Sequence, residues 1–371
     1  MKNNAFIKLF RRWIMSVDRL SLLTILCIIF IGVWVNIAST PAVAMKLNLP
    51  PFYFVKRHIT MIPIAIFIII LLSCMHVRHI RRLSVFGYFI CLGLIILTLL
   101  FGAEIKGAKR WLSFCGFSFQ ASEFFKPILT VITAWLVSEQ YRDREFPGIF
   151  LSAICVLIVV SLLLLQPDVG MVIIIALSLI GQLFISGLST MMIIIFLLSS
   201  IVAIFGLYCV FPHFADRING FILKGGEEID MYQVQKSIAA FKSGGLLGKG
   251  PGEGVIKTLV PDAHSDFVFS VIAEEFGFIM CIAIISLFIF LIFRSLIKIS
   301  ESSNMFCFST VFGILFQVGM QVLINVSTSL NLIPTKGMTM PFISYGGSSL
   351  LASSISVGIL LAIKRSSAIR N

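Results

Sequence analysis

The chain has 371 residues, of which 58% are hydrophobic and 12% are charged, and its mean hydropathy is +1.03. This composition excludes a soluble globular protein, because a soluble domain carries about a quarter charged residues. The net charge of +12 is spread over short basic clusters between apolar tracts, which favours anionic lipid head groups or an anionic substrate over nucleic acid as partners.

The apolar tracts are about 20 residues long and lack the alternation of barrel strands, so they predict membrane-spanning helices. We expect an all-α polytopic membrane protein that forms one transmembrane domain over residues 1–371. About ten spans are predicted, near residues 20–38, 59–76, 83–102, 122–138, 148–165, 168–186, 190–211, 267–293, 305–328 and 341–363. The first tract is too long for a signal-peptide core, and we interpret it as an uncleaved helix. The eight cysteines show no metal-ligand spacing and are interpreted as small core residues.

Lysine and arginine in the short loops favour an orientation with both termini in the cytoplasm. This orientation makes residues 212–265 a long extracytoplasmic loop between the seventh and eighth helices. Nine glycines in the loop indicate turns, and a loop of this length in a compact protein is usually functional or disordered.

The stretch before and at the start of the fourth span carries the sequences GAKRW and FSFQASEFFKP. Trp111 is expected at the membrane interface and Ser122 at the cap of the helix, with Glu123 and Lys126 three residues apart on one face. Two interpretations stay open for this stretch, which also contains Arg110. It could anchor the chain at the interface and form an intrahelical ion pair, or it could line a polar cavity that faces a substrate.

The turn QPDVG joins two otherwise apolar spans and contains Asp168. Asp168 could cap the sixth helix, which is worth about 1 kcal/mol, or it could line a cavity. The two roles are compatible.

A polar run, PDAHSDF, leads into the eighth span. Asp266 lies beside His264 in sequence, and Ser270 and Glu274 follow it at i+4 and i+8, so a polar face is expected to descend from the outer surface. A single acid at a helix start is often a cap. An acid with these neighbours is a stronger candidate for function, because ionisable groups within spans are costly.

The sequence LIPTKGMTMPFISYGGSS precedes and opens the last span. Helix packing or an opened backbone would explain Gly346 and Gly347, but packing does not explain Lys336 in a short outer loop. The ninth span also has a stripe of polar side chains at helical spacing: Gln317, Gln321 and Asn325. The simplest interpretation of this stripe is hydrogen bonding to another helix.

These motifs, in this order and spacing, resemble the FtsW/RodA family of shape, elongation, division and sporulation proteins. The resemblance runs from about Ala38 to the end. The last motif has the division-type form and not the elongation-type form, and sporulation members share it; of these two, the division type is our prediction. Ser265 stands where threonine is common and Phe125 where alanine is common, and neither departure affects the implied chemistry.

The resemblance implies a peptidoglycan glycosyltransferase that polymerises lipid II into β-1,4 glycan strands and releases undecaprenyl pyrophosphate. It carries the family's essential acid onto Asp266, which would act as the general base of a single, inverting displacement. Cations would stabilise the leaving pyrophosphate, for which Arg110, Lys126 and Lys336 are candidates, with a divalent cation such as magnesium or manganese as an additional candidate. Three further residues complete the candidate substrate site: Glu123, Asp168 and Tyr345.

The family resemblance also implies partners: a class B penicillin-binding protein, which is the transpeptidase, and other proteins of the divisome, in the bacterial cytoplasmic membrane at the septum. A lipid II flippase and a noncatalytic scaffold for the transpeptidase are the alternatives. A flippase needs a polar path to the cytoplasmic side, whereas most of the candidate charges gather at the outer mouth, which favours catalysis there.

Overall fold

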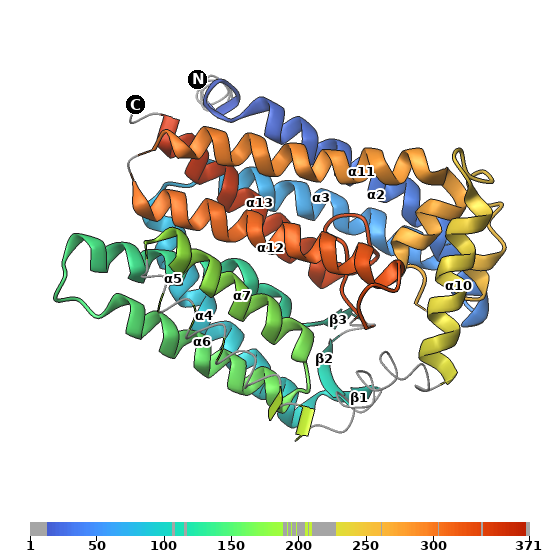
Figure 1. The fold of residues 1–371 in the computed structure, drawn as a ribbon, viewed down its shortest axis with the longest axis horizontal. Coiled ribbons are helices and arrows are strands. Elements are labelled where there is room, and N and C mark those ends of the chain that lie inside the picture. Colours follow the sequence, from blue (N-terminus) through green and yellow to red (C-terminus); the bar gives the residue numbers. More distant parts are fainter. Residues whose placement is uncertain are drawn as a thin grey trace, which may run out of the picture.

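The computed structural model describes residues 13–105, 108–114, 117–187, 228–260, 262–302, 304–334 and 337–368, with isolated positions between 191 and 209. Ten of its elements are α-helices (Figure 1): α2 (Arg19–Lys46), α3 (Tyr53–Cys74), α4 (Val77–Phe101), α5 (Ser122–Arg142), α6 (Gly148–Leu165), α7 (Val169–Ile185), α10 (Glu228–Gly244), α11 (Val268–Ser300), α12 (Met305–Ser329) and α13 (Gly347–Ala368). The prediction of a helical polytopic protein is confirmed.

Seven of the described helices are long and apolar enough to cross a membrane: α2, α3, α4, α6, α11, α12 and α13. The helix α7 is apolar but has 17 residues, and α5 carries more polar residues along its 21. These nine helices coincide with nine of the ten predicted spans. The remaining predicted span, 190–211, lies largely outside the described residues.

The long segment predicted as one loop contains the helix α10 in its described part. This helix packs against α11, and a short 3₁₀ turn, η1 (Ile256–Thr258), follows it. Figure 1 shows α10 at the end of the bundle opposite the marked chain termini.

A small antiparallel sheet, not foreseen from the sequence, joins α4 to α5. Its strands are β1 (Ala103–Ile105), β2 (Ala108–Phe114) and β3 (Phe117–Phe119), in the order β1-β2-β3. The sheet lies at the same end of the bundle as α10 (Figure 1). Trp111, which is expected at the membrane interface, lies in β2 of this sheet.

The helix α11 is broken at Gly277, whose φ of 77° and ψ of 177° are not helical. A break inside a span frees backbone groups that lipid cannot satisfy. Here the segment 245–250 satisfies them: Lys249 N and Gly250 N donate to the carbonyls of residues 274 and 275, and Phe278 N donates to Gly245 O. The segment after α10 is therefore docked on α11 by backbone hydrogen bonds.

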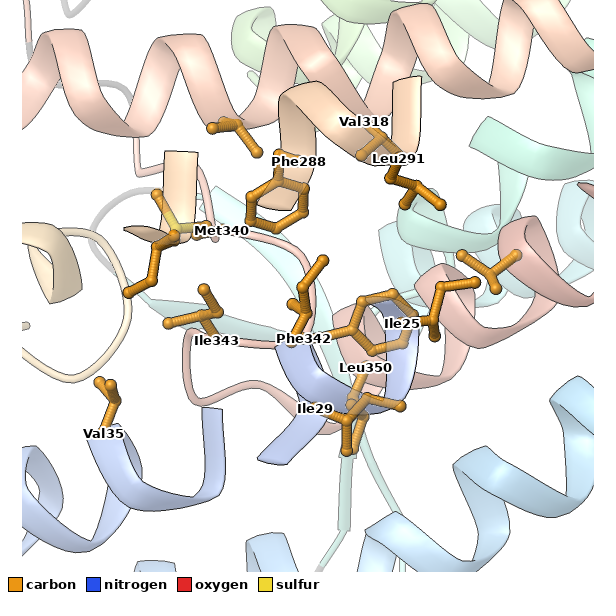
Figure 2. Packing of buried hydrophobic residues seen from close by; sticks show 14 of the residues in the cluster. Ile25, Ile29, Val35, Phe288, Leu291, Val318, Met340, Phe342, Ile343 and Leu350 are labelled. Carbon is orange, nitrogen blue, oxygen red and sulfur yellow. The ribbon is translucent and has the colours of Figure 1, made fainter. Parts of the chain in front are cut away.

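The last span begins later than predicted. The prediction placed its start at residue 341, but α13 starts at Gly347, and residues 338–344 form a buried non-helical segment. Figure 2 shows Phe342 and Ile343 of this segment among the core side chains of α2, α11 and α12, which include Ile25, Phe288 and Val318. Burying these apolar side chains holds the segment in the bundle.

The same segment is also tied to α2 by hydrogen bonds. Asn36, which is 1% exposed, donates from Nδ2 to Ile343 O at 2.8 Å and to Gly32 O at 2.7 Å. Non-helical backbone at membrane depth is tolerated where protein groups pair with it. The helix α2 thus supports the residues that precede α13.

Candidate active site

Asp266 lies on the turn that leads into α11, at the end of the bundle opposite the chain termini, and its side chain is half-buried. Its backbone N donates to Asp262 O at 3.1 Å. Asn325 of α12 donates from Nδ2 to Asp266 O at 3.0 Å and to Met338 O at 2.7 Å. One buried amide therefore joins the turn of Asp266 to the segment before α13.

Gly337 lies directly against the carboxylate. Its φ is +62°, and a Cβ atom built on it would lie 3.2 Å from Asp266 Oδ2. Glycine suits this position both for its left-handed backbone and for the absence of a side chain. The LIPTKG motif thereby contributes to the surroundings of the acid.

The segment before α13 holds the same turn from the other side. Ser344 Oγ donates to Ser265 O at 2.6 Å, and Tyr345 N donates to His264 O at 2.9 Å. The ring of Tyr345 packs against His264 and against Phe54 of α3, with centroids 5.4 and 5.2 Å apart. Burial lowers the pKa of the His264 imidazole and raises the pKa of the Tyr345 hydroxyl, which favours the neutral form of both.

Arg110 and Asp168 form a second polar group. Arg110 Nε donates to Gln166 O at 3.2 Å, its Nη2 donates to Pro167 O, and its Nη1 lies 3.8 Å from Asp168 Oδ1. Asp168 also caps α7, because its Oδ1 accepts from Met171 N at 3.4 Å. Burial raises the pKa of the Asp168 carboxyl, and the Arg110 guanidinium opposes that shift.

Glu123 and Lys126 form a buried ion pair in the first turn of α5, with Lys126 Nζ 2.6 Å from Glu123 Oε2. The two residues are 7% and 4% exposed, and both act electrostatically on Asp168. The predicted side-chain cap by Ser122 is wrong, because the helix begins at Ser122 with no side-chain cap hydrogen bond. The buried ion pair and the polar group around Asp168 are thus parts of one constellation.

The start of α13 links this constellation to the turn of Asp266. Gln120 donates from Nε2 to Asp168 Oδ2 at 3.5 Å and from its backbone N to Ser348 Oγ at 3.0 Å. The adjacent Ser349 shares a hydrogen bond of 2.7 Å with Thr339, which follows Met338. An ion pair and hydrogen bonds between these residues and their direct neighbours in the chain therefore connect Arg110 to the turn of Asp266. Lys336, the other predicted cation, lies outside the described residues.

Glu274 does not continue a polar face from Asp266. Its carboxylate accepts from Ile256 N and Lys257 N, both at 2.8 Å, and Glu275 forms an ion pair with Lys257. Lys257 Nζ also donates to Ala38 O of α2 at 2.9 Å. These acids fasten the segment after α10 to α2 and α11, which is a structural role and not the predicted polar face below Asp266.

Asn325 and Ser344 are the site residues that sequence reasoning missed or placed differently. Asn325 is predicted as part of a polar stripe that forms hydrogen bonds to another helix. The spacing of this stripe does not indicate that Asn325 contacts the turn of Asp266. Ser344 lies inside a motif that was noted, but its contact with Ser265 joins residues 79 positions apart. Such contacts depend on how the helices pack, so the local sequence does not predict them.

The chemistry available here centres on one half-buried carboxylate in a polar setting. Such a group can accept a proton from a hydroxyl brought within hydrogen-bond distance. Among the residues that the structure describes, no three His, Cys, Asp or Glu side chains converge as a protein-built metal site would require.

The family model of the FtsW, RodA and SpoVE cell cycle proteins matches residues 18–369. A relative from Caulobacter vibrioides, described as a probable peptidoglycan glycosyltransferase FtsW, is 36% identical over 95% of this chain and 90% of its own length. A relative from Saccharophagus degradans with the same description is 32% identical over 92% of this chain and 90% of its own length.

Solved structures share the fold. A chain from a structure on the coordination of polymerisation and crosslinking by a peptidoglycan synthase complex is 25% identical, with a TM-score of 0.77 over 94% of this chain and 98% of that chain. The rod shape determining protein RodA of Thermus thermophilus is 26% identical, with a TM-score of 0.69 over 95% of this chain and 97% of that chain.

Proposed function

We propose that this chain, which belongs to the FtsW, RodA and SpoVE family of cell cycle proteins, is a peptidoglycan glycosyltransferase that polymerises lipid II. The descriptions of the relatives as probable peptidoglycan glycosyltransferases support this function. One structural observation carries the proposal: a half-buried carboxylate, Asp266, on a turn that hydrogen bonds from Asn325, Ser344 and Tyr345 hold in place.

In the proposed reaction Asp266 is the general base. An acceptor sugar hydroxyl loses its proton to the carboxylate, and its oxygen bonds to the anomeric carbon of the donor. The bond from that carbon to the pyrophosphate breaks, and undecaprenyl pyrophosphate leaves with the bonding electron pair. An α-linked donor gives a β-1,4 product in this single displacement, which requires no enzyme nucleophile.

Cations near the departing pyrophosphate would lower the barrier, because charge develops there in the transition state. Arg110 is the best supported of the described candidates, since it is half-buried and backbone carbonyls at the QPDVG turn fix its direction. Lys126 is paired with Glu123, so we assign this pair to shaping the proposed substrate site together with Asp168. Lys336 and Tyr345 complete the proposed substrate site.

The proposed setting is septal wall synthesis during cell division. Lipid II stays in the bilayer through its polyprenyl tail while its sugars reach the outer face, where the segment 212–265 would lie. Both termini would be cytoplasmic, which follows the loop charges. The proposed partners are a class B penicillin-binding protein and other divisome proteins, and the likeness to a chain from a peptidoglycan synthase complex supports such an assembly.

The test is polymerisation of lipid II by the purified protein with its transpeptidase partner, followed as glycan chains on a gel. General-base catalysis contributes about 10²- to 10⁴-fold, so Asp266→Asn is expected to lower the rate by that factor. Asp262→Asn is the matched control: it makes the same chemical change on the same turn, and asparagine tolerates the φ of 51° found there. The control is expected to keep the wild-type rate.

The alternatives give different results. Equal polymer from wild type and Asp266→Asn would remove Asp266 as the base. No polymer from folded wild type with its partner would instead favour a lipid II flippase or a scaffold. Transport of lipid II between the leaflets of a vesicle would then separate these two.

A further inference from the structure

A cavity of about 370 Å³ lies where α4 begins beside α5, far from Asp266 in the fold. Six residues line it: Arg78, Arg81, Arg82, Val85, Phe86 and Trp135. Three of the six are arginines and none is acidic. A cavity with this lining attracts an anion.

The three arginines of the cavity differ in their exposure and in their contacts. Arg78 and Arg82 are exposed, whereas Arg81 is half-buried and its guanidinium carbon lies 3.9 Å from the ring centroid of Phe306. The same carbon lies 5.9 Å from the ring of Trp135. These ring contacts hold Arg81 in place beside the two exposed cations. A fixed guanidinium with two adjacent ones suits bidentate binding of phosphate oxygens.

The position of the cavity is that of a membrane interface. It adjoins the first turns of α4, a helix apolar enough to span the bilayer, and α4 begins just after Cys74 and Met75. Arg365 Nη2 at the end of α13 donates to the carbonyls of both these residues, so the cavity lies at the end of the bundle where the chain terminates. Tryptophan is enriched at such interfaces.

The apolar part of the lining continues toward the bilayer. Val85 and Phe86 follow the arginines by one turn along α4, and Phe86 is 69% exposed. A ligand with a phosphate group and hydrocarbon chains would fit both parts of this surface. Free phosphate would use the arginines alone.

We propose that this cavity binds the head group of an anionic phospholipid, with its phosphodiester against the arginines and an acyl chain along Val85 and Phe86. Basic pockets between spanning helices recognise anionic head groups in this way. The site is separate from the proposed catalytic reaction and does not depend on it.

The test is a titration of the delipidated full-length protein in detergent, read by native mass spectrometry. The probes are phosphatidylglycerol, zwitterionic phosphatidylcholine and inorganic phosphate as a competitor. Each basic residue near an anionic surface contributes roughly a factor of five in affinity, so Arg78→Gln with Arg82→Gln is expected to bind phosphatidylglycerol about thirty-fold more weakly. Replacing the same two arginines by lysine is expected to restore only part of the binding, because lysine keeps the charge but lacks the planar guanidinium that binds phosphate oxygens bidentately.

The matched control is Arg142→Gln with Arg144→Gln, which removes two exposed arginines outside the cavity and is expected to change the affinity less than about twofold. Quenching of tryptophan fluorescence by brominated phosphatidylglycerol locates the lipid, and Trp135→Phe is expected to remove the quenched component. Equal binding of the two lipids, equal loss in both arginine pairs, or quenching unaffected by Trp135→Phe would each overturn the proposal. Displacement of the lipid by millimolar phosphate would show that the site binds free phosphate and would contradict the lipid as its ligand.

Discussion

The hydrogen bonds of the Asn325 amide predict how the turn of Asp266 is held. Its Nδ2 donates to Asp266 O at 3.0 Å and to Met338 O at 2.7 Å, and the residue is 1% exposed. Asn325→Leu keeps a similar volume and leaves two acceptors without this donor. Leaving a buried polar group unsatisfied costs about 1–3 kcal/mol, so the turn and the segment before α13 would lose about 2–6 kcal/mol of mutual stabilisation.

The expected result is a slower enzyme that still folds. A shift of about 1 Å in a reacting group can cost roughly 10²-fold in rate, so we expect kcat for glycan polymerisation to fall by about that factor while KM for lipid II stays within about twofold. Asn325→Asp should be equally slow, because it puts carboxylate oxygens against two carbonyl oxygens. Asn325→Gln keeps the amide and is expected to recover part of the rate.

The assay is lipid II polymerisation by each variant with the transpeptidase partner, alongside thermal unfolding in detergent. Gln321→Leu is the matched control, because it removes another buried amide one turn earlier on α12. If Asn325→Leu polymerised at the wild-type rate, the amide would not position Asp266. If Gln321→Leu were equally slow, the effect would belong to the polarity of the helix and not to these two hydrogen bonds.

Two further predictions concern the surroundings of the site. Lys257→Met leaves Glu275, which is 1% exposed, without its partner, so we expect about 3–5 kcal/mol of destabilisation, seen as a lower thermal unfolding temperature. The double variant with Glu275→Met should recover most of that loss, and a double variant no more stable than the single one would contradict the reasoning. Gly337→Ala adds a Cβ atom 3.2 Å from Asp266 Oδ2 at a φ of +62°, so lipid II polymerisation should slow at least tenfold with an unfolding temperature within a few degrees of wild type. Wild-type activity in this variant would show that the close approach does not matter.

Hydropathy predicts most of the fold because an apolar tract that crosses the bilayer has to form a helix. A tract of about 20 apolar residues must satisfy its backbone internally, so nine of the predicted spans correspond to described helices. The motifs likewise predict Asp266, Arg110 and Asp168 as candidate site residues.

Hydropathy misses short strands that pair with each other, and it misses segments whose backbone hydrogen bonds come from distant parts of the chain. The strands β1, β2 and β3 are short, and their sequence pattern is too brief to be distinguished from that of a loop. The break at Gly277 lies inside an apolar tract that reads as one helix, and its partners come from residues 245–250. Spacing predicts that Glu274 continues a polar face from Asp266, because its backbone hydrogen-bond donors, on the preceding loop, cannot be identified from spacing.

The link between the first helix and the segment before α13 has a consequence for biosynthesis. The hydrogen bond from Asn36 to Ile343 joins residues 307 positions apart. Synthesis proceeds from the N-terminus at about 5–20 residues per second, so this contact cannot form until roughly 15–60 s after Asn36 has left the ribosome. During that interval α2 is in the membrane with a polar amide that lacks its final partner. Truncation before residue 343 is therefore expected to leave the first helix without its native neighbours, so the N-terminal part of the bundle matures together with the C-terminal part.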